Sequence, residues 1–93
     1  MVFKRQLEEA GITLSKQATA EYEVYYNDTY VAYLSRERHK GEGKWGSKTP
    51  AYYSWEVVRS SEPELYLTSD TFDLAKKALL DNVETLKGIA EWK

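Results

Sequence analysis

The feature that most limits the possible folds is a dense run of tyrosine and valine between residues 20 and 36. These residue types suit the pleated, half-buried surface of a β-sheet. Tyr22, Val24 and Tyr26 occupy alternate positions, so they should share one face of a strand. Asn27-Asp28-Thr29 then interrupts the alternation, and Asn and Asp tolerate the positive φ of a tight turn. The run therefore predicts a β-hairpin.

The other elements follow from periodicity and from turn residues. A short helix over 3–10 should end at Gly11, and a polar connection should follow over 15–19. Further strands are expected over 30–35, 53–58 and 64–68. A long helix over 72–86 should be capped by Ser69 or Asp70 and ended by Gly88, which leaves a tail over 88–93.

This order indicates an α+β domain in two layers. We expect a three- to four-stranded antiparallel sheet with a short N-terminal helix and a long C-terminal helix packed on one face. No break in composition divides the chain, so residues 1–93 should form one domain. The predicted core consists of Phe3, Leu7, Val24, Val31, Tyr33, Trp55, Val57, Leu67, Phe72, Ala75, Leu79, Val83 and Leu86.

Composition excludes several kinds of chemistry. The chain has no cysteine, which removes disulfides, thiolate metal sites and cysteine nucleophiles. Neither a secretory signal nor a run of eighteen apolar residues is present, so we expect a cytoplasmic protein that does not span a membrane. Nothing in the sequence indicates a cofactor or a metal ion.

Residues 36–50 form a long basic loop in this interpretation, with three of the five glycines and one of the two prolines. Five lysines and arginines against two glutamates give residues 36–48 a net charge of +3, while the rest of the chain carries −5. Cationic side chains bind phosphates with release of counterions, and a tryptophan among them can stack on a base. The candidate binding residues here are Arg36, Arg38, Lys40, Lys44, Trp45 and Lys48. A solvated hairpin tip is the alternative.

The eight tyrosines are the second candidate binding feature. Adjacent strand residues point to opposite faces, so one member of each pair Tyr25-Tyr26 and Tyr52-Tyr53 must face away from the helices. Tyr25 and Tyr52 are the candidates for this aromatic surface. Tyrosine offers rigid apolar area and a hydroxyl, which suits a protein interface. Cross-strand pairing within the sheet is the alternative.

Catalysis has little support in the sequence. His39 is the single histidine, and a general base needs a partner that orients it. Carboxylate pairs such as Glu21 and Glu23 are typical of solvated strand faces, and no serine lies in a nucleophile-elbow motif. We therefore expect no enzymatic activity.

The predicted helix–strands–helix order resembles that of double-stranded-RNA-binding domains, and sheet followed by helix resembles the small DNA-binding domains of some phage integrases. The short tyrosine-rich chain also resembles proteins carried by bacteriophages and integrated elements. These likenesses concern topology and composition, and no family is assigned.

The sequence predicts a small non-enzymatic binding module that uses the tyrosine-rich sheet face and the basic loop as one contact surface. A protein partner is favoured because the chain is acidic, with a pI of about 5.4, whereas nucleic-acid-binding domains are usually basic. Nucleic acid bound through Arg36–Lys48 is the alternative. A homodimer, paired through a sheet edge or through the tyrosine-rich face, is also open.

Overall fold

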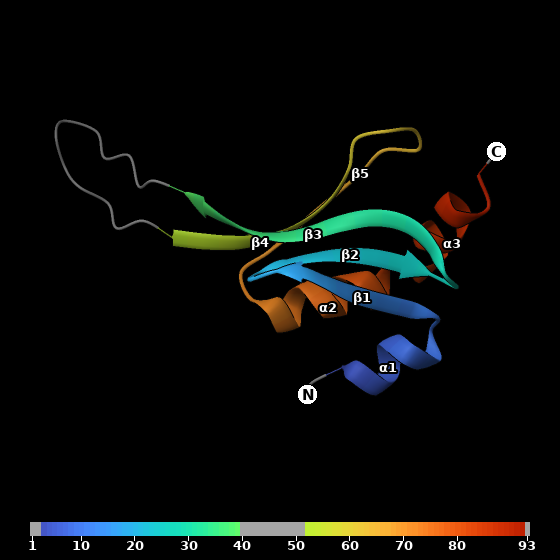
Figure 1. Ribbon diagram of the computed structural model, residues 1–93, viewed down its shortest axis with the longest axis horizontal. Coiled ribbons are helices and arrows are strands. Elements are labelled where there is room, and N and C mark those ends of the chain that lie inside the picture. Colours follow the sequence, from blue (N-terminus) through green and yellow to red (C-terminus); the bar gives the residue numbers. More distant parts are fainter. Residues whose placement is uncertain (1–2, 40–51, 93) are drawn as a thin grey trace, which may run out of the picture.

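The computed structural model describes residues 3–39 and 52–92, and Figure 1 shows their arrangement. The elements in chain order are α1 (Lys4–Glu9), β1 (Ile12–Ala18), β2 (Glu21–Tyr26), β3 (Thr29–His39), β4 (Tyr52–Arg59), β5 (Leu65–Ser69), α2 (Phe72–Asp81) and α3 (Val83–Ala90).

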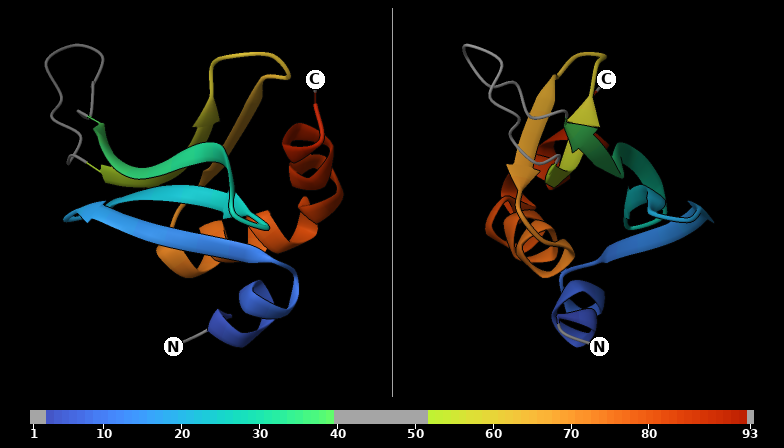
Figure 2. Two further views of the ribbon diagram at one scale, coloured as in Figure 1. Left: turned by 45° about the vertical axis from the view of Figure 1, so that its right-hand side comes forward. Right: turned by 90° about the vertical axis from the view of Figure 1, so that its left-hand side faces the viewer.

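The five strands form one antiparallel sheet in the order β1-β2-β3-β4-β5. All three helices lie on one side of this twisted sheet, which arches over them in the two views of Figure 2. Helix α2 packs on β4 and β5, α3 packs on β2 and β3, and α1 contacts β1 and α2. The α+β class and the antiparallel sheet are thus confirmed, with five strands in place of three or four. No helix in the described ranges has the length and apolar character needed to cross a membrane.

The predicted hairpin is present and has a two-residue turn. Asn27 and Asp28 have φ values of 46° and 69°, and the Asn27 amide donates a 2.9 Å hydrogen bond to the carbonyl of Gly11. Just past the turn, Val24 pairs with Ala32 but Tyr25 pairs with Tyr30. The residue between them in β3, Val31, is therefore a β-bulge, and the bulge exchanges the faces on either side of it.

The bulge explains two corrections to the predicted core. Leu34 and Ala32 are fully buried beneath the helices, whereas Tyr33 points to the opposite face. A separate correction, unrelated to the bulge, concerns Phe3, which is the residue before α1, is half-buried and lies outside the core cluster. The buried hydrophobic residues are Leu7, Ile12, Val24, Val31, Ala32, Leu34, Val57, Ala75, Leu79, Leu86 and Ile89, and Trp55, Leu67, Phe72 and Val83 pack against them.

The polar connection predicted at residues 15–19 is wrong, because Ile12–Ala18 is strand β1. Ile12 is buried and Leu14 packs on the core, while Thr13 and Ser15 alternate with them on the other face. Among the strands of the described ranges, β1 is at an edge and pairs with β2 alone. Its outer positions can therefore be polar without loss of core packing.

The predicted long helix is divided in two at Asn82. The Asn82 side chain donates a 2.7 Å hydrogen bond to the carbonyl of Ala78, and its backbone leaves the helical region at φ −113° and ψ 22°. Neither of the predicted caps is used, since the Thr71 hydroxyl accepts the 3.1 Å bond from the amide of Leu74. Helix α3 also runs through Gly88 to Ala90, so the first three residues of the predicted tail at 88–93 are helical.

Strands β3 and β4 continue beyond the layer of helices as a two-stranded arm, which reaches to the left in Figure 1. Arg36–His39 of the predicted loop therefore belong to β3. The rest of that loop, with Lys40, Lys44, Trp45 and Lys48, lies outside the described residues.

Candidate functional site: the open face of the sheet

The side of the sheet that faces away from the helices forms a continuous surface, which we call the open face. Strand alternation and the pairing registers place each residue on it. Its members are Thr13, Ser15, Ala18, Glu21, Glu23, Tyr25, Tyr30, Tyr33, Ser35, Glu37, His39, Tyr52, Ser54, Glu56, Val58, Tyr66 and Thr68.

Five of the eight tyrosines lie on the open face. Tyr30, Tyr52 and Tyr66 are 45%, 58% and 61% exposed, although each belongs to a strand of the sheet. Tyr25 and Tyr30 are cross-strand partners whose rings meet edge to face at 5.9 Å. Aromatic area that remains in water after folding does not contribute to the protein's own core, so it is available to a partner.

Glutamates lie among these tyrosines on the open face, and they accept hydrogen bonds from neighbouring side chains. The Tyr25 hydroxyl donates a 2.9 Å hydrogen bond to Glu23 Oε1, which also accepts from Gln17 Nε2 at 3.1 Å. On the neighbouring strand, Ser35 donates to Glu37 at 2.9 Å. The carboxylates thus accept hydrogen bonds from neutral groups.

Acidic and basic residues of the strands lie on opposite faces of the sheet. The glutamates of the described strands all lie on the open face: Glu21, Glu23, Glu37 and Glu56. The lysines and arginines of the same strands all lie on the helix side: Lys16, Arg36, Arg38 and Arg59. The open face is therefore acidic as well as aromatic.

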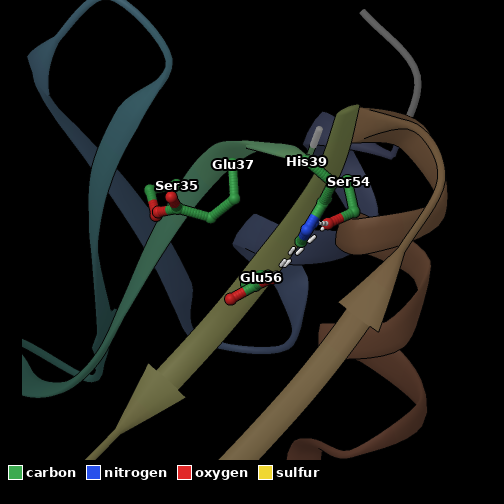
Figure 3. Close-up of polar contacts among 5 residues, drawn as sticks. All are labelled: Ser35, Glu37, His39, Ser54 and Glu56. Atoms are coloured by element: carbon green, nitrogen blue, oxygen red, sulfur yellow. Dashed lines mark hydrogen bonds and ion pairs between the residues drawn. The ribbon is translucent and has the colours of Figure 1, made fainter. Parts of the chain in front are cut away.

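A polar cluster connects β3 and β4 on the arm (Figure 3). His39 Nε2 lies 2.6 Å from Ser54 Oγ and 3.6 Å from Glu56 Oε2, and the His39 ring stacks on Tyr52 with centroids 4.8 Å apart. In a serine-hydrolase triad the serine and the carboxylate contact different nitrogens of the imidazole. Here Ser54 and Glu56 lie beside the same nitrogen, so the cluster lacks the geometry of a catalytic triad. The described residues also contain no group of three side chains able to hold a metal ion.

The acidic surroundings change the acidity of Tyr25. Its hydrogen bond to Glu23 raises the pKa of the phenol above the ordinary value of 10.0, and partial desolvation and the charge of Glu23 act in the same direction. A phenolate at this position would lose the hydrogen bond and face a carboxylate.

The phenol pKa values of two further tyrosines on the open face are also raised. Partial desolvation, followed by the charge of Glu21, raises the pKa of Tyr33, and partial desolvation followed by the charge of Glu56 raises the pKa of Tyr66. The three shifted phenols belong to β2, β3 and β5. Glutamates of the open face contribute to each of the three shifts and raise the pKa in every case.

We predict that part of the tyrosine titration occurs above pH 10, and that Glu23→Gln moves the Tyr25 step to lower pH. A raised phenol pKa contributes stability that is fully present below the unfolded-state value and is lost as pH rises through the folded-state value. The variant should therefore lose less stability at alkaline pH than the wild type. Ultraviolet difference absorbance of tyrosinate measures the titration. Glu84→Gln, on α3, is the control, and an equal shift in that variant would contradict the local cause.

The structure separates the predicted binding residues into two groups. Tyr25 and Tyr52 lie on the open face, while Arg36 and Arg38 lie on the opposite side of the arm. There the Arg36 guanidinium stacks 4.7 Å from the centroid of the Tyr53 ring, which is 50% exposed. The single contact surface predicted from sequence is therefore divided in the described residues between an acidic face and a basic side.

Sequence reasoning missed the glutamates as members of the site, and it treated Glu21 and Glu23 as solvated. The alternation of Glu21, Glu23 and Tyr25 within one strand was the available signal. Glu37 and Glu56 carry no comparable local signal, because only the β3–β4 register brings them onto the same face.

A cavity of about 320 Å³ lies between α1, β1 and the start of α2. Its walls are mainly apolar, including Leu7, Ile12 and Phe72, and Lys76 is its one fully buried charged residue. Lys76 Nζ is paired with Asp73 Oδ1 at 3.0 Å. Because this charge is already compensated, the cavity gives a weaker indication of a ligand than the open face.

The chain matches no protein-family model, no curated protein and no solved structure. Strand β1 also departs from the element order on which the likeness to double-stranded-RNA-binding domains rests. Indications of function therefore come from the open face itself.

Proposed function

We propose that this chain is a non-enzymatic binding module that docks a protein partner on its open face. The observation that carries the proposal is the set of tyrosines Tyr30, Tyr52 and Tyr66, each 45–61% exposed on a face that none of α1, α2 and α3 covers in the described part of the chain. Tyrosine is enriched at protein interfaces, where a rigid ring fills a pocket and the hydroxyl finds a partner.

Affinity capture with paired variants tests the proposal. The tagged protein is exposed to an extract of the cells that encode it, beside Tyr30→Ser/Tyr66→Ser on the open face and Tyr53→Ser on the opposite side. A specific partner should be lost with the first variant and retained with the second. Circular dichroism checks that each variant is folded. Equal retention of the partner by all three proteins would contradict docking on the open face.

A second copy of the chain is a competing occupant, since β1 and β5 are sheet edges and a dimer could cover the tyrosines. Sedimentation at rising concentration separates the two cases. A monomer leaves the face available to another protein, while a dimer that Tyr30→Ser/Tyr66→Ser dissociates would replace the proposed partner by a second copy.

Nucleic acid is the second candidate function, and the basic side of the arm favours it. Arg36 and Arg38 project there beside Tyr53, and an arginine with a neighbouring ring suits phosphate and base. Titration with duplex DNA, single-stranded DNA and RNA at about 50 and 200 mM salt tests this candidate, because phosphate contacts weaken steeply over that range. Binding that Arg36→Gln/Arg38→Gln abolishes and Lys16→Gln retains would support it. No binding at the lower salt concentration would exclude it.

A further inference from the structure

The charge of the open face has no counterpart within the described protein. Among residues 3–39 and 52–92, no lysine or arginine pairs with Glu21, Glu23, Glu37 or Glu56. His39 is the one residue of the face that can become a cation, and it lies 3.6 Å from Glu56 Oε2. Carboxylates that share one face repel one another, so a cation that binds among them relieves this repulsion.

The arrangement of rings and carboxylates indicates which kind of cation the open face would bind best. At Tyr25 the hydroxyl lies 2.9 Å from Glu23 Oε1, and its ring meets Tyr30, whose side chain is 45% exposed. An aromatic surface beside a carboxylate suits a guanidinium, which is planar, stacks on rings and donates two parallel hydrogen bonds to a carboxylate. An ammonium has a compact charge with a tighter hydration shell, and it gains less from the ring.

The same charges argue against polyanionic partners on this face. A phosphate or a glutamate-rich segment would approach carboxylates on β2, β3 and β4 with no arginine or lysine of the described strands beside them. We therefore expect nucleic acid to bind on the opposite side of the arm, where Arg36 and Arg38 lie.

We infer that the open face recognises an arginine-rich segment of a protein partner, with guanidinium groups stacked on its tyrosines and bonded to its glutamates. This inference rests on the proposed docking function and adds the chemistry of the partner. We expect the largest contributions from Glu23, which is bonded to Tyr25, and from Glu56, which is a diagonal neighbour of Tyr66 across β4 and β5.

The probe is a short fluorescein-labelled peptide in which arginine alternates with serine. Matched peptides carry lysine or glutamate at the arginine positions. Fluorescence anisotropy measures affinity at about 50 and 200 mM salt, and amide chemical shifts locate the peptide. The test variant is Glu23→Gln/Glu56→Gln, which keeps side-chain size and removes two charges. Glu84→Gln/Glu91→Gln, in the first turn and at the C-cap of α3, is the control, because it makes the same change of net charge outside the strands.

The arginine peptide should bind the wild type and the α3 control equally, and at least about tenfold more weakly to Glu23→Gln/Glu56→Gln. The lysine peptide should bind several-fold more weakly than the arginine peptide, and the glutamate peptide should not bind. Shift changes should fall on β2–β5.

Three results would overturn the inference: no saturable binding of the arginine peptide, equal affinity for the lysine peptide, or equal losses in the two double variants. If the peptide fails while Tyr30→Ser/Tyr66→Ser still loses a captured partner, the partner's chemistry is wrong and the docking function stands. If capture is insensitive to the tyrosines, the docking function itself is wrong.

Discussion

Replacing Leu34 with alanine should lower the free energy of unfolding by about 2–5 kcal/mol, the range found when a large buried side chain is truncated in a core that cannot collapse. Leu34 has no exposed surface and lies in the central strand β3. Its cross-strand neighbours are Tyr22 and Val57, and α3 packs on the same strand. Strands β2 and β4 and helix α3 therefore surround the Leu34 side chain. None of them can move into the cavity left by the truncation without losing its own contacts.

Urea denaturation of the wild type and the variant measures this loss, with equal m-values required for the comparison. Leu74→Ala is the matched control, since it removes the same atoms from a residue that is 48% exposed on α2. A loss for Leu34→Ala as small as that for the control would mean that the register of β3 is off by one, with Tyr33 in the core.

That register shows where sequence analysis was sufficient and where it failed. The hairpin was predictable because Asn27 and Asp28 have an intrinsic tolerance for positive φ, and the faces of β2 followed from simple alternation. The faces of β3 did not follow, because the extra residue Val31 is apolar and fits either face. A bulge depends on the pairing of two strands, and no pattern within one strand reveals it.

The other errors have similar origins. Strand β1 was missed because Ser15, Lys16 and Gln17 read as a loop, whereas an edge strand tolerates polar residues that face water. The break between α2 and α3 was missed because the apolar stripe continues through Val83 and Leu86. Asn82 breaks the helix through a bond from its own side chain to a backbone carbonyl, a contact that competes locally with the helix.

The candidate site was partly accessible from sequence for the same reasons. Alternation required that one tyrosine of each adjacent pair face away from the helices, and the structure places Tyr25 and Tyr52 there. The acidic character of that face could not be predicted in the same way. Glu23 on β2 and Glu56 on β4 are seen to share a face only when the β2–β3 and β3–β4 registers are both known. Local patterns thus predicted the aromatic residues, while tertiary pairing determined their charged neighbours.

The largest electrostatic effect should come from the buried lysine of α2. Lys76 is 2% exposed, stacks 4.6 Å from the Phe72 ring centroid and pairs with Asp73, which is 55% exposed. Asp73→Asn should cost about 1–3 kcal/mol of unfolding free energy, less than for a wholly buried pair because water can reach the position of Asp73. Lys76→Met keeps the length of the side chain and removes the charge, so it should be neutral or stabilising.

A double-mutant cycle separates the ion pair from the other role of Asp73, which lies in the first turn of α2 and interacts with the helix dipole. In the Lys76→Met background, Asp73→Asn should cost only the few tenths of a kcal/mol that the dipole contributes. Asp81→Asn is the control, because its pair with Lys77 spans 3.1 Å between side chains more than half exposed and should contribute less than about 1 kcal/mol. An equal cost for Asp73→Asn in both backgrounds would show that the carboxylate does not stabilise Lys76, and the cavity beside α2 would then hold an uncompensated charge open to an anionic ligand.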